Sequence, residues 1–220
     1  ARTKSNNFYS WGHNNYGQLG IGDTTNRYKP TKIIAFNPVT AGGVLKFAAS
    51  GQSNLSFHVL DGNGYMWQAG YNAHGVALNG STTNNTTLAR SVTAPTAGAT
   101  VNFWAHSPGS SDTYNMIYMR TTSGATYFAG YNAAYYYSGI GNQTSPQSNP
   151  VLVPNATNLK KVFLRSSHSN NITAFAISDR GELWCNGYSN YNRHGNEYGN
   201  NSLQQDGTNY YWFRMAIPAG

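Results

Sequence analysis

Carboxylates that could carry chemistry are scarce in this sequence. Hydrolysis needs a pair of carboxylates, or a nucleophile beside a base. Of the seven acids, Asp61 and Asp179 lie in equivalent predicted hairpin turns, where an aspartate caps the backbone, and Asp23 lies in a repeated motif. Few acids remain for other roles, so the sequence predicts no catalytic residue and favours a protein that is not an enzyme.

The six histidines and the single cysteine form no metal-binding pattern. No two histidines have the His-x-x-x-His spacing of a zinc helix, and one cysteine allows neither an intrachain disulfide nor a cysteine-based zinc site. His58, His106 and His168 lie near corresponding places in the repeats described below. Cys185 follows a repeated tryptophan, where a small buried filler is expected. The sequence therefore predicts no metal and no cofactor.

Tyrosine and asparagine side chains are in excess in two segments, 131–137 and 188–194. Aromatic rings flanked by amides suit stacking on sugar rings or filling pockets of a protein partner. These segments supply the candidate ligand-binding residues, which are Tyr131, Tyr135, Tyr136, Tyr137, Tyr188, Tyr191, Asn192 and Arg193. The alternative, that the rings pack between repeats, stays open.

Composition points to an all-β chain with many tight turns. Charged residues make up only 10% of the 220 residues and aromatic residues 14%, while Gly and Asn, which favour turns, are abundant. The net charge of +7 comes from scattered bases, and the densest group, Lys160, Lys161 and Arg165, is expected to be solvated. Nucleic acid is therefore not an expected partner. No apolar run approaches the roughly 20 residues of a membrane span, so no membrane insertion is expected.

Four copies of one unit follow each other along the chain. An aromatic residue followed closely by glycine recurs near residues 11–12, 67–70, 128–130 and 184–187, and these glycines are 58, 60 and 57 residues apart. An asparagine follows in each copy, at Asn14, Asn72, Asn132 and, one step later, Asn190. The aromatic anchors Trp11, Trp67, Phe128 and Trp184 are expected in the core. Repeats of this period indicate stacked structural units.

Each later copy contains the pattern of three or four strands. A β-rich segment at 55–60, 115–120 and 172–177 is followed by a turn and by a strand that runs into the anchor, and Asp-Gly in the first such turn is a strong hairpin signal. A further strand precedes each hairpin, at 44–49, 101–105 and 159–164. This is the content of a propeller blade, which buries its faces only by stacking on neighbours.

The run 11–23 (WGHNNYGQLGIGD), with Pro30 after it, resembles the signature of the regulator of chromosome condensation repeat, and the hairpin 57–62 resembles that family's other hallmark. The resemblance implies a β-propeller, seven-bladed in the family, with a structural histidine at His58. We therefore predict one all-β propeller domain over 1–220.

Four repeats fill about four blades, so the propeller is predicted to be incomplete, or the chain to be a fragment. Three explanations stay open: a longer propeller, a ring completed by another chain, and closure with fewer blades. Copy one lacks leading strands, and the segment 211–217 resembles a further leading strand.

Two functions from different classes remain. The polar, poorly charged composition favours a receptor-binding adhesin of a phage tail fibre or similar extracellular particle, with a virion location. Its partners would be a host cell-surface glycan or outer-membrane protein, and other particle subunits could complete the ring. The alternative is an intracellular interaction propeller in cytoplasm or nucleus, because the family resemblance implies guanine-nucleotide exchange or scaffold roles.

Overall fold

The computed structural model describes residues 1–5, 7–37, 41–50, 55–91, 99–106, 114–132, 138–141, 144–166, 172–187, 205–206 and 209–215. Within these ranges the chain contains strands, turns and bends but no helix. The predicted all-β class is therefore confirmed.

The strands form four successive antiparallel sheets, here called blades 1 to 4. Blade 1 pairs β1 (Tyr9–Gly12) with β2 (Arg27–Lys32). Blade 2 has the order β3 (Val44–Ser50), β4 (Ser56–Asp61), β5 (Met66–Gly70) and β6 (Asn85–Arg90). Blade 3 has the order β7 (Thr100–His106), β8 (Met116–Thr121), β9 (Thr126–Gly130) and β10 (Gln147–Leu152). Blade 4 has the order β11 (Leu159–Ser166), β12 (Ile172–Ser178), β13 (Leu183–Gly187) and β16 (Phe213–Arg214). A small ribbon of β14 (Gln205–Asp206) and β15 (Asn209–Tyr210) follows β13 in the chain.

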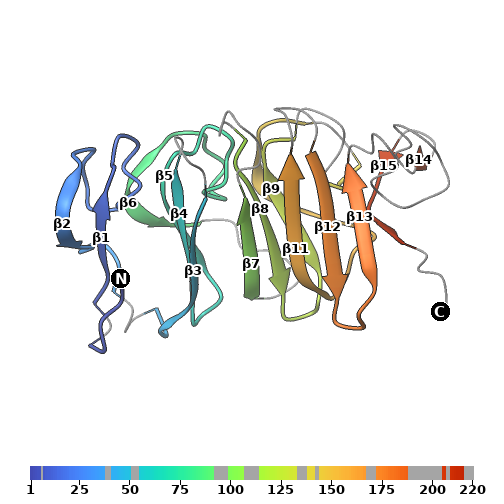
Figure 1. Cartoon of the computed structure of the whole chain (residues 1–220), viewed down its shortest axis with the longest axis horizontal. Helices are drawn as coiled ribbons and strands as arrows, with labels where there is room; N and C mark the ends of the chain where they lie inside the picture. The colour runs from blue at the N-terminus through green and yellow to red at the C-terminus, as the bar shows by residue number, and fades with distance from the viewer. Residues whose placement is uncertain are drawn as a thin grey trace.

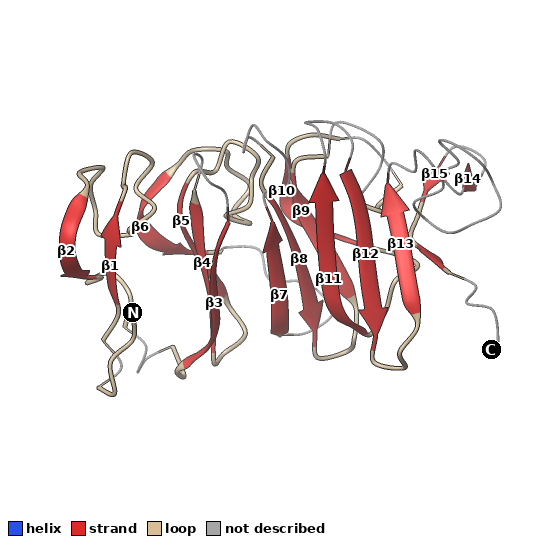
Figure 2. Cartoon of the chain, viewed as in Figure 1, coloured by secondary structure: helices blue, strands red, loops and turns tan. Residues whose placement is uncertain are grey.

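The blades stand side by side in chain order, with blade 1 at one end of the row and blade 4 at the other (Figure 1). The first strands β3, β7 and β11 lie next to one another, so they define one common side of the row. No sheet closes on itself among the described residues (Figure 2). The structure is an incomplete propeller, as the sequence predicts.

The hydrophobic core lies between blades rather than inside them. Between blades 2 and 3, Leu60 and Met66 of blade 2 pack against Phe103, Ile117 and Met119 of blade 3. Similar clusters join blade 1 to blade 2 and blade 3 to blade 4. Each blade therefore depends on its neighbours for burial, as expected for stacked repeats.

One of the four predicted aromatic anchors, Trp11, does not lie in the core. Measured from the glycine that ends each third strand, Trp67 and Trp184 lie three positions back, but Trp11 lies only one position back. Trp11 is 51% exposed, whereas Phe128 is fully buried. The expectation that Trp11 belongs to the core is wrong.

The end of the chain is also placed differently from the expectation. The segment 211–217 was expected to be a leading strand, but its β16 pairs with β13 as the last strand of blade 4. Trp212 is buried there and donates a hydrogen bond from Nε1 to the carbonyl oxygen of Ser138. Residues beyond 215 lie outside the described ranges.

The hairpin turns use two different caps. Asp61 caps its turn as predicted, since its Oδ1 accepts the amides of Asn63 and Tyr65 at 3.0 and 2.9 Å. In blade 4 the same strand position is Ser178, whose Oγ accepts the amides of Arg180 and Glu182. Asp179 is therefore displaced by one residue from the capping position, and it forms an ion pair with Arg120 of blade 3 instead.

Candidate functional site: an aromatic ladder on the loop face

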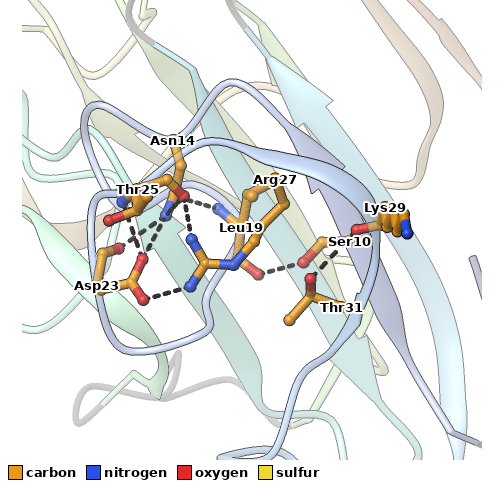
Figure 3. Close-up of polar contacts among 8 residues, drawn as sticks. All are labelled: Ser10, Asn14, Leu19, Asp23, Thr25, Arg27, Lys29 and Thr31. Carbon is orange, nitrogen blue, oxygen red and sulfur yellow. Dashed lines mark hydrogen bonds and ion pairs between the residues drawn. The ribbon is translucent and has the colours of Figure 1, made fainter.

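A buried asparagine shapes the loop that follows the third strand of a blade. In blade 1, Asn14 is fully buried, and its Nδ2 donates to the backbone oxygens of Asp23 and Thr25 at 2.8 and 3.1 Å. Its Oδ1 accepts the amide of Leu19 at 2.9 Å. One side chain thus ties together both ends of the loop (Figure 3).

Blade 2 repeats this arrangement 58 residues later. Asn72 donates from Nδ2 to the backbone oxygens of Ser81 and Thr83, both at 3.0 Å, and accepts the amide of Ala77 at 2.8 Å. In blade 3, Asn132 is also buried, and its backbone N–H donates to Ser145 Oγ. In blades 1 and 2 the repeated asparagine therefore has a structural reason, because a buried side-chain amide needs its hydrogen bonds made.

Asp23 reinforces the blade 1 loop. Its Oδ1 accepts the Thr25 amide at 2.9 Å, and Arg27 pairs with its Oδ2 at 2.5 Å (Figure 3). The Thr25 hydrogen bond and then the Arg27 guanidinium hold the pKa of Asp23 below its usual value. The structural role predicted for this acid is confirmed.

The loops of neighbouring blades also interlock. Gly75 has φ +78°, and a Cβ built on it would lie 2.4 Å from the Cα of Ser148 in β10 of the next blade. Glycine is required because any side chain would collide with that backbone. The loop after β5 is therefore seated on blade 3, which fixes the residues around Asn72.

Four rings carried by these loops and one that precedes β8 form a continuous row, here called the aromatic ladder: Tyr16, Tyr71, His74, Tyr114 and Tyr131. Tyr16 of blade 1 meets Tyr71 of blade 2 edge to face, with ring centroids 5.2 Å apart. Tyr71 meets His74 in the same manner at 5.9 Å. These are favourable aromatic geometries, and they cross from one blade to the next.

The ladder continues into blade 3. His74 lies 5.1 Å from Tyr131 and stacks on Tyr114 at 6.2 Å, and the rings of Tyr114 and Tyr131 are 4.1 Å apart. Met116 pairs with Gly130, so Tyr114 before β8 and Tyr131 after β9 emerge at the same end of the sheet. All five rings are partly buried, so the ladder presents aromatic edges across three blades.

Three rings of the ladder, Tyr71, His74 and Tyr131, are uncharged at neutral pH. Burial lowers the pKa of His74 to about 4, so its imidazole is neutral. Burial first, and then Tyr16, raises the pKa of Tyr71, and burial followed by Tyr114 raises the pKa of Tyr131. Uncharged rings with hydroxyl groups suit apolar and hydrogen-bonding contacts, as at the centres of protein interfaces.

Of the predicted site residues, the described part of the chain includes only Tyr131, and it belongs to the ladder. The others fall outside the described residues: Tyr135, Tyr136, Tyr137, Tyr188, Tyr191, Asn192 and Arg193. The sequence prediction missed Tyr16, Tyr71, His74 and Tyr114. One signal was available, because the residue after the anchor glycine is tyrosine at 71, 131 and 188.

The histidine and cysteine predictions are confirmed only in part. His58 is buried with Nε2 3.3 Å from the Val76 oxygen, and burial lowers its pKa to about 4. The strand position of His58 is occupied by Tyr118 in blade 3 and by Phe175 in blade 4. The prediction that His106 lies near the position equivalent to His58 is therefore wrong. His106 is the last residue of β7 and lies opposite Met116. His168 lies outside the described residues.

Cys185 is a buried filler, as predicted. Burial raises the pKa of its thiol to about 12, so the thiol stays protonated and is a poor nucleophile. Among the described residues, no three His, Cys, Asp or Glu side chains are grouped so that they could hold a metal ion. The same residues include no helix that is long and apolar enough to cross a membrane.

Comparison with known proteins agrees with this architecture. Residues 6–55 match the family model described as the regulator of chromosome condensation (RCC1) repeat. The ultraviolet-B receptor UVR8 of Arabidopsis thaliana is 37% identical over 67 residues, which cover 30% of this chain and 14% of UVR8.

Two crystal structures share the fold at low sequence identity. Human WBSCR16 has a TM-score of 0.62 at 16% identity, over 99% of this chain and 50% of that chain. Prp20p of Saccharomyces cerevisiae has a TM-score of 0.55 at 15% identity, over 96% of this chain and 59% of that chain. This chain therefore spans about half of each structure.

The fold and the repeated loops define an open arc of propeller blades. Residues 6–55 carry an RCC1-type repeat, and the described blades share the fold of the two crystal structures.

One expectation about partners is wrong. A host cell-surface glycan or outer-membrane protein was expected, whereas Prp20p was described with its binding to Gsp1p and histones, which are proteins. Nothing in the similar proteins points to a tail fibre, an adhesin or a virion.

Proposed function

We propose that this chain is a non-enzymatic, intracellular protein-interaction propeller and that the aromatic ladder contacts its protein partner. The observation that carries the proposal is the ladder itself: partly exposed, uncharged rings from three blades, held by loops that Asn14 and Asn72 fix. Tyrosine is enriched at interface centres because it offers a large contact area together with a hydroxyl group.

The similar proteins support a protein partner. Prp20p binds Gsp1p and histones, and its fold covers 96% of this chain. The two first probes are therefore purified Gsp1p and core histones. Nucleotide release from Gsp1p, measured in the same assay, separates an exchange role from simple binding.

The test compares two double variants of equal chemistry. Tyr71→Ala with Tyr131→Ala removes two ladder rings, whereas Tyr28→Ala with Tyr65→Ala removes exposed rings outside the ladder, since Tyr28 is 94% exposed and Tyr65 is 36% exposed. We expect binding of a probe by the native chain to weaken about tenfold or more in the ladder variant and less than about twofold in the control. Circular dichroism checks that both variants are folded.

An unbiased measurement accompanies the two probes. Proteins captured from nuclear and cytoplasmic extracts are quantified for the native chain and both double variants. Loss of particular proteins in the ladder variant alone supports the proposal. Equal capture by all three chains, together with no ladder-dependent binding of Gsp1p or histones, contradicts it.

A further inference from the structure

Charged side chains of blades 2 to 4 gather near the hairpin turns. The loops after the third strands of blades 2 and 3, residues 71–84 and 131–146, contain no charged residue. Around the turns, at the lower end of blades 3 and 4 in Figure 1, bases outnumber acids. The bases are Lys46, Arg90, Arg120, Lys160, Lys161, Arg180 and Arg214, and the acids are Asp61, Asp179 and Glu182. The turn end therefore has a positive charge that those loops lack.

The three acids at this end are already engaged. Asp61 is buried, and it accepts hydrogen bonds from amides of its own turn and from Trp67 Nε1 at 2.8 Å. Asp179 and Glu182 each form an ion pair with an arginine. In the described part of the chain, the other five bases at the turn end form no ion pair. Their positive charge is available to an anionic partner.

The ammonium group of Lys46 is half-buried against neutral groups of blade 3. Its Nζ donates to Asn102 Oδ1 at 2.8 Å and to the carbonyl oxygen of Phe103, and it lies 5.0 Å from the centre of the Phe103 ring. Burial first, and then Lys161, lowers the pKa of Lys46 below its usual value. An ammonium has three hydrogens to donate, so one remains after these two bonds. An anion beside this group would therefore stabilise its charge.

Val101 places an apolar side chain next to this ammonium. It precedes Asn102, and the pairing of β7 with β8 shifts there, as the matching pairings shift at Leu45 and Lys160. Val101 is 44% exposed, although β3 and β11 of the neighbouring blades both lie beside β7. Irregularities of this kind re-aim side chains and recur next to binding sites. The exposure of Val101 therefore comes from the geometry of its own strand.

Lys160 extends the surface onto blade 4. It is exposed and holds the same repeat position as Val101. Because β3, β7 and β11 lie next to one another, Lys46, Val101 and Lys160 follow each other across three blades. These three side chains are here called the turn-end strip. The strip has a cation at each end and an apolar side chain in the middle.

We propose that the turn-end strip binds a short acidic segment of a partner protein. One carboxylate of the segment pairs with Lys46, an aliphatic side chain covers Val101, and a second carboxylate pairs with Lys160. Charge-assisted hydrogen bonds to carboxylates are strong, and the apolar contact between them excludes water. The strip lies at the end of the blades opposite the aromatic ladder and does not rest on the function proposed above.

A nucleic acid or a lipid surface fits this strip less well. Phosphates would meet the two lysines, but Val101 would have no apolar partner in a nucleic-acid backbone, whose interfaces with proteins are polar. A flat bilayer would first touch the polar turn 122–124, which lies beyond Val101 because Thr100 pairs with Thr121. A protein segment carries carboxylates and aliphatic side chains together, and it is narrow enough to pass between the turns.

The first test selects binders of the 220-residue chain from a library of short random peptides. A parallel selection uses Lys46→Gln, and peptides enriched only on the native chain are kept. We expect these peptides to carry an acid on each side of an aliphatic residue. The most enriched peptide is then labelled, and its Kd is measured by fluorescence anisotropy. Replacing its acids by the corresponding amides should weaken binding about tenfold or more.

Lysine variants of the chain test the charges of the strip. Lys160→Gln should weaken binding of the selected peptide about threefold, because an exposed ion pair contributes little. Lys46→Arg keeps the positive charge and should restore most of the binding that Lys46→Gln loses. Lys29→Gln removes an exposed base from blade 1 and should change binding less than about twofold. Circular dichroism checks that each variant is folded.

A matched pair of substitutions in blade 3 tests the apolar part of the strip. Val101→Asp should abolish binding, because it places a carboxylate against an acidic segment. Leu152→Asp adds the same charge at a 46% exposed position on the outer strand of that blade, and it should change binding less than about twofold.

Three results would overturn the proposal. The first is that no peptide distinguishes the native chain from Lys46→Gln. The second is that the selected peptides carry no acids, or bind Val101→Asp as well as the native chain. The third is that a short DNA duplex, or vesicles containing phosphatidylserine, bind the native chain more tightly than any selected peptide and lose that binding in Lys46→Gln. The strip would then belong to a different class of partner.

Discussion

Two junctions between blades are built from the same repeat but differ in completeness. Between blades 2 and 3, Phe103 is fully buried, because the ring of His58 covers it. Between blades 1 and 2, the matching Phe47 is 53% exposed, and the place that corresponds to His58 comes before Ala1 in the repeat register. The difference shows that the first strand of a blade is buried by the second strand of the preceding blade.

The most direct way to break this comparison is to truncate the two matching phenylalanines. Phe103→Ala should lower the free energy of unfolding by about 4 kcal/mol, as for a fully buried ring that leaves a cavity. Phe47→Ala should cost about 1 kcal/mol, because the half-exposed ring loses less burial. Urea denaturation measures both variants, and equal losses would contradict the difference between the junctions.

The interlocked loops supply the next largest effect. Gly75→Ala should cost about 3 kcal/mol or more, because its positive φ is strained for alanine and the Cβ meets the Ser148 backbone at 2.4 Å. Gly181 has φ +79° but nothing within 4 Å of a built Cβ, so Gly181→Ala should cost only about 1 kcal/mol. Thermal and urea unfolding separate the collision from the strain. A Gly181 variant as unstable as the Gly75 variant would show that backbone strain alone decides.

Acid should weaken the complete junction through His58. Burial lowers the pKa of His58 to about 4 from a usual value of 6.5, so the unfolded chain binds the proton more readily. The part of the free energy of unfolding that depends on a neutral His58 is fully present above pH 6.5 and is lost as the pH falls toward 4. The loss should reach up to about 3 kcal/mol.

The variant His58→Phe, which carries the ring found at Phe175, should reduce that pH dependence while keeping the cover over Phe103. His74, whose pKa burial also lowers to about 4, should retain part of it. The free energy of unfolding measured between pH 7.5 and pH 4.5 checks this. An unchanged slope in His58→Phe would show that His58 does not carry the effect.

Removing a loop asparagine should have the smallest of these effects. Asn72→Ala loses three hydrogen bonds and leaves buried backbone groups unpaired, at a cost of about 2 kcal/mol. Asn79→Ala, in the same loop, loses the hydrogen bond that Oδ1 accepts from the Ser81 amide and should cost less than about 1 kcal/mol. Because Asn72 lies between Tyr71 and His74, its variant should also weaken any binding through the aromatic ladder.

Much of the fold follows from the sequence because its signals are local. The repeated glycines, the Asp-Gly turn and the β-rich segments predict the hairpins of blades 2 to 4 close to their observed bounds. The errors come from register. Trp11 lies one residue before its glycine rather than three, and Asp179 lies one residue past the capping Ser178. At Asp179 the shift of one residue is enough to move the carboxylate out of the position that caps the turn.

The aromatic ladder was only partly predictable, for a different reason. Tyr131 belongs to a visible tyrosine-rich segment, but Tyr16, Tyr71, His74 and Tyr114 are isolated in the sequence. They meet because the loops of three blades are packed side by side, and no local window of sequence contains that packing. Only the tyrosine that repeats after the anchor glycine marks the position in advance.

The most direct test of the difference between the two junctions is hydrogen exchange of the 220-residue chain at two matching amides. The Ala69 amide pairs with Phe57 inside blade 2, whereas the Trp11 amide faces the open edge of blade 1. We expect strong protection at Ala69 and exchange near the unprotected rate at Trp11. Equal protection at both amides would contradict it, because the edge of β1 would then already be covered.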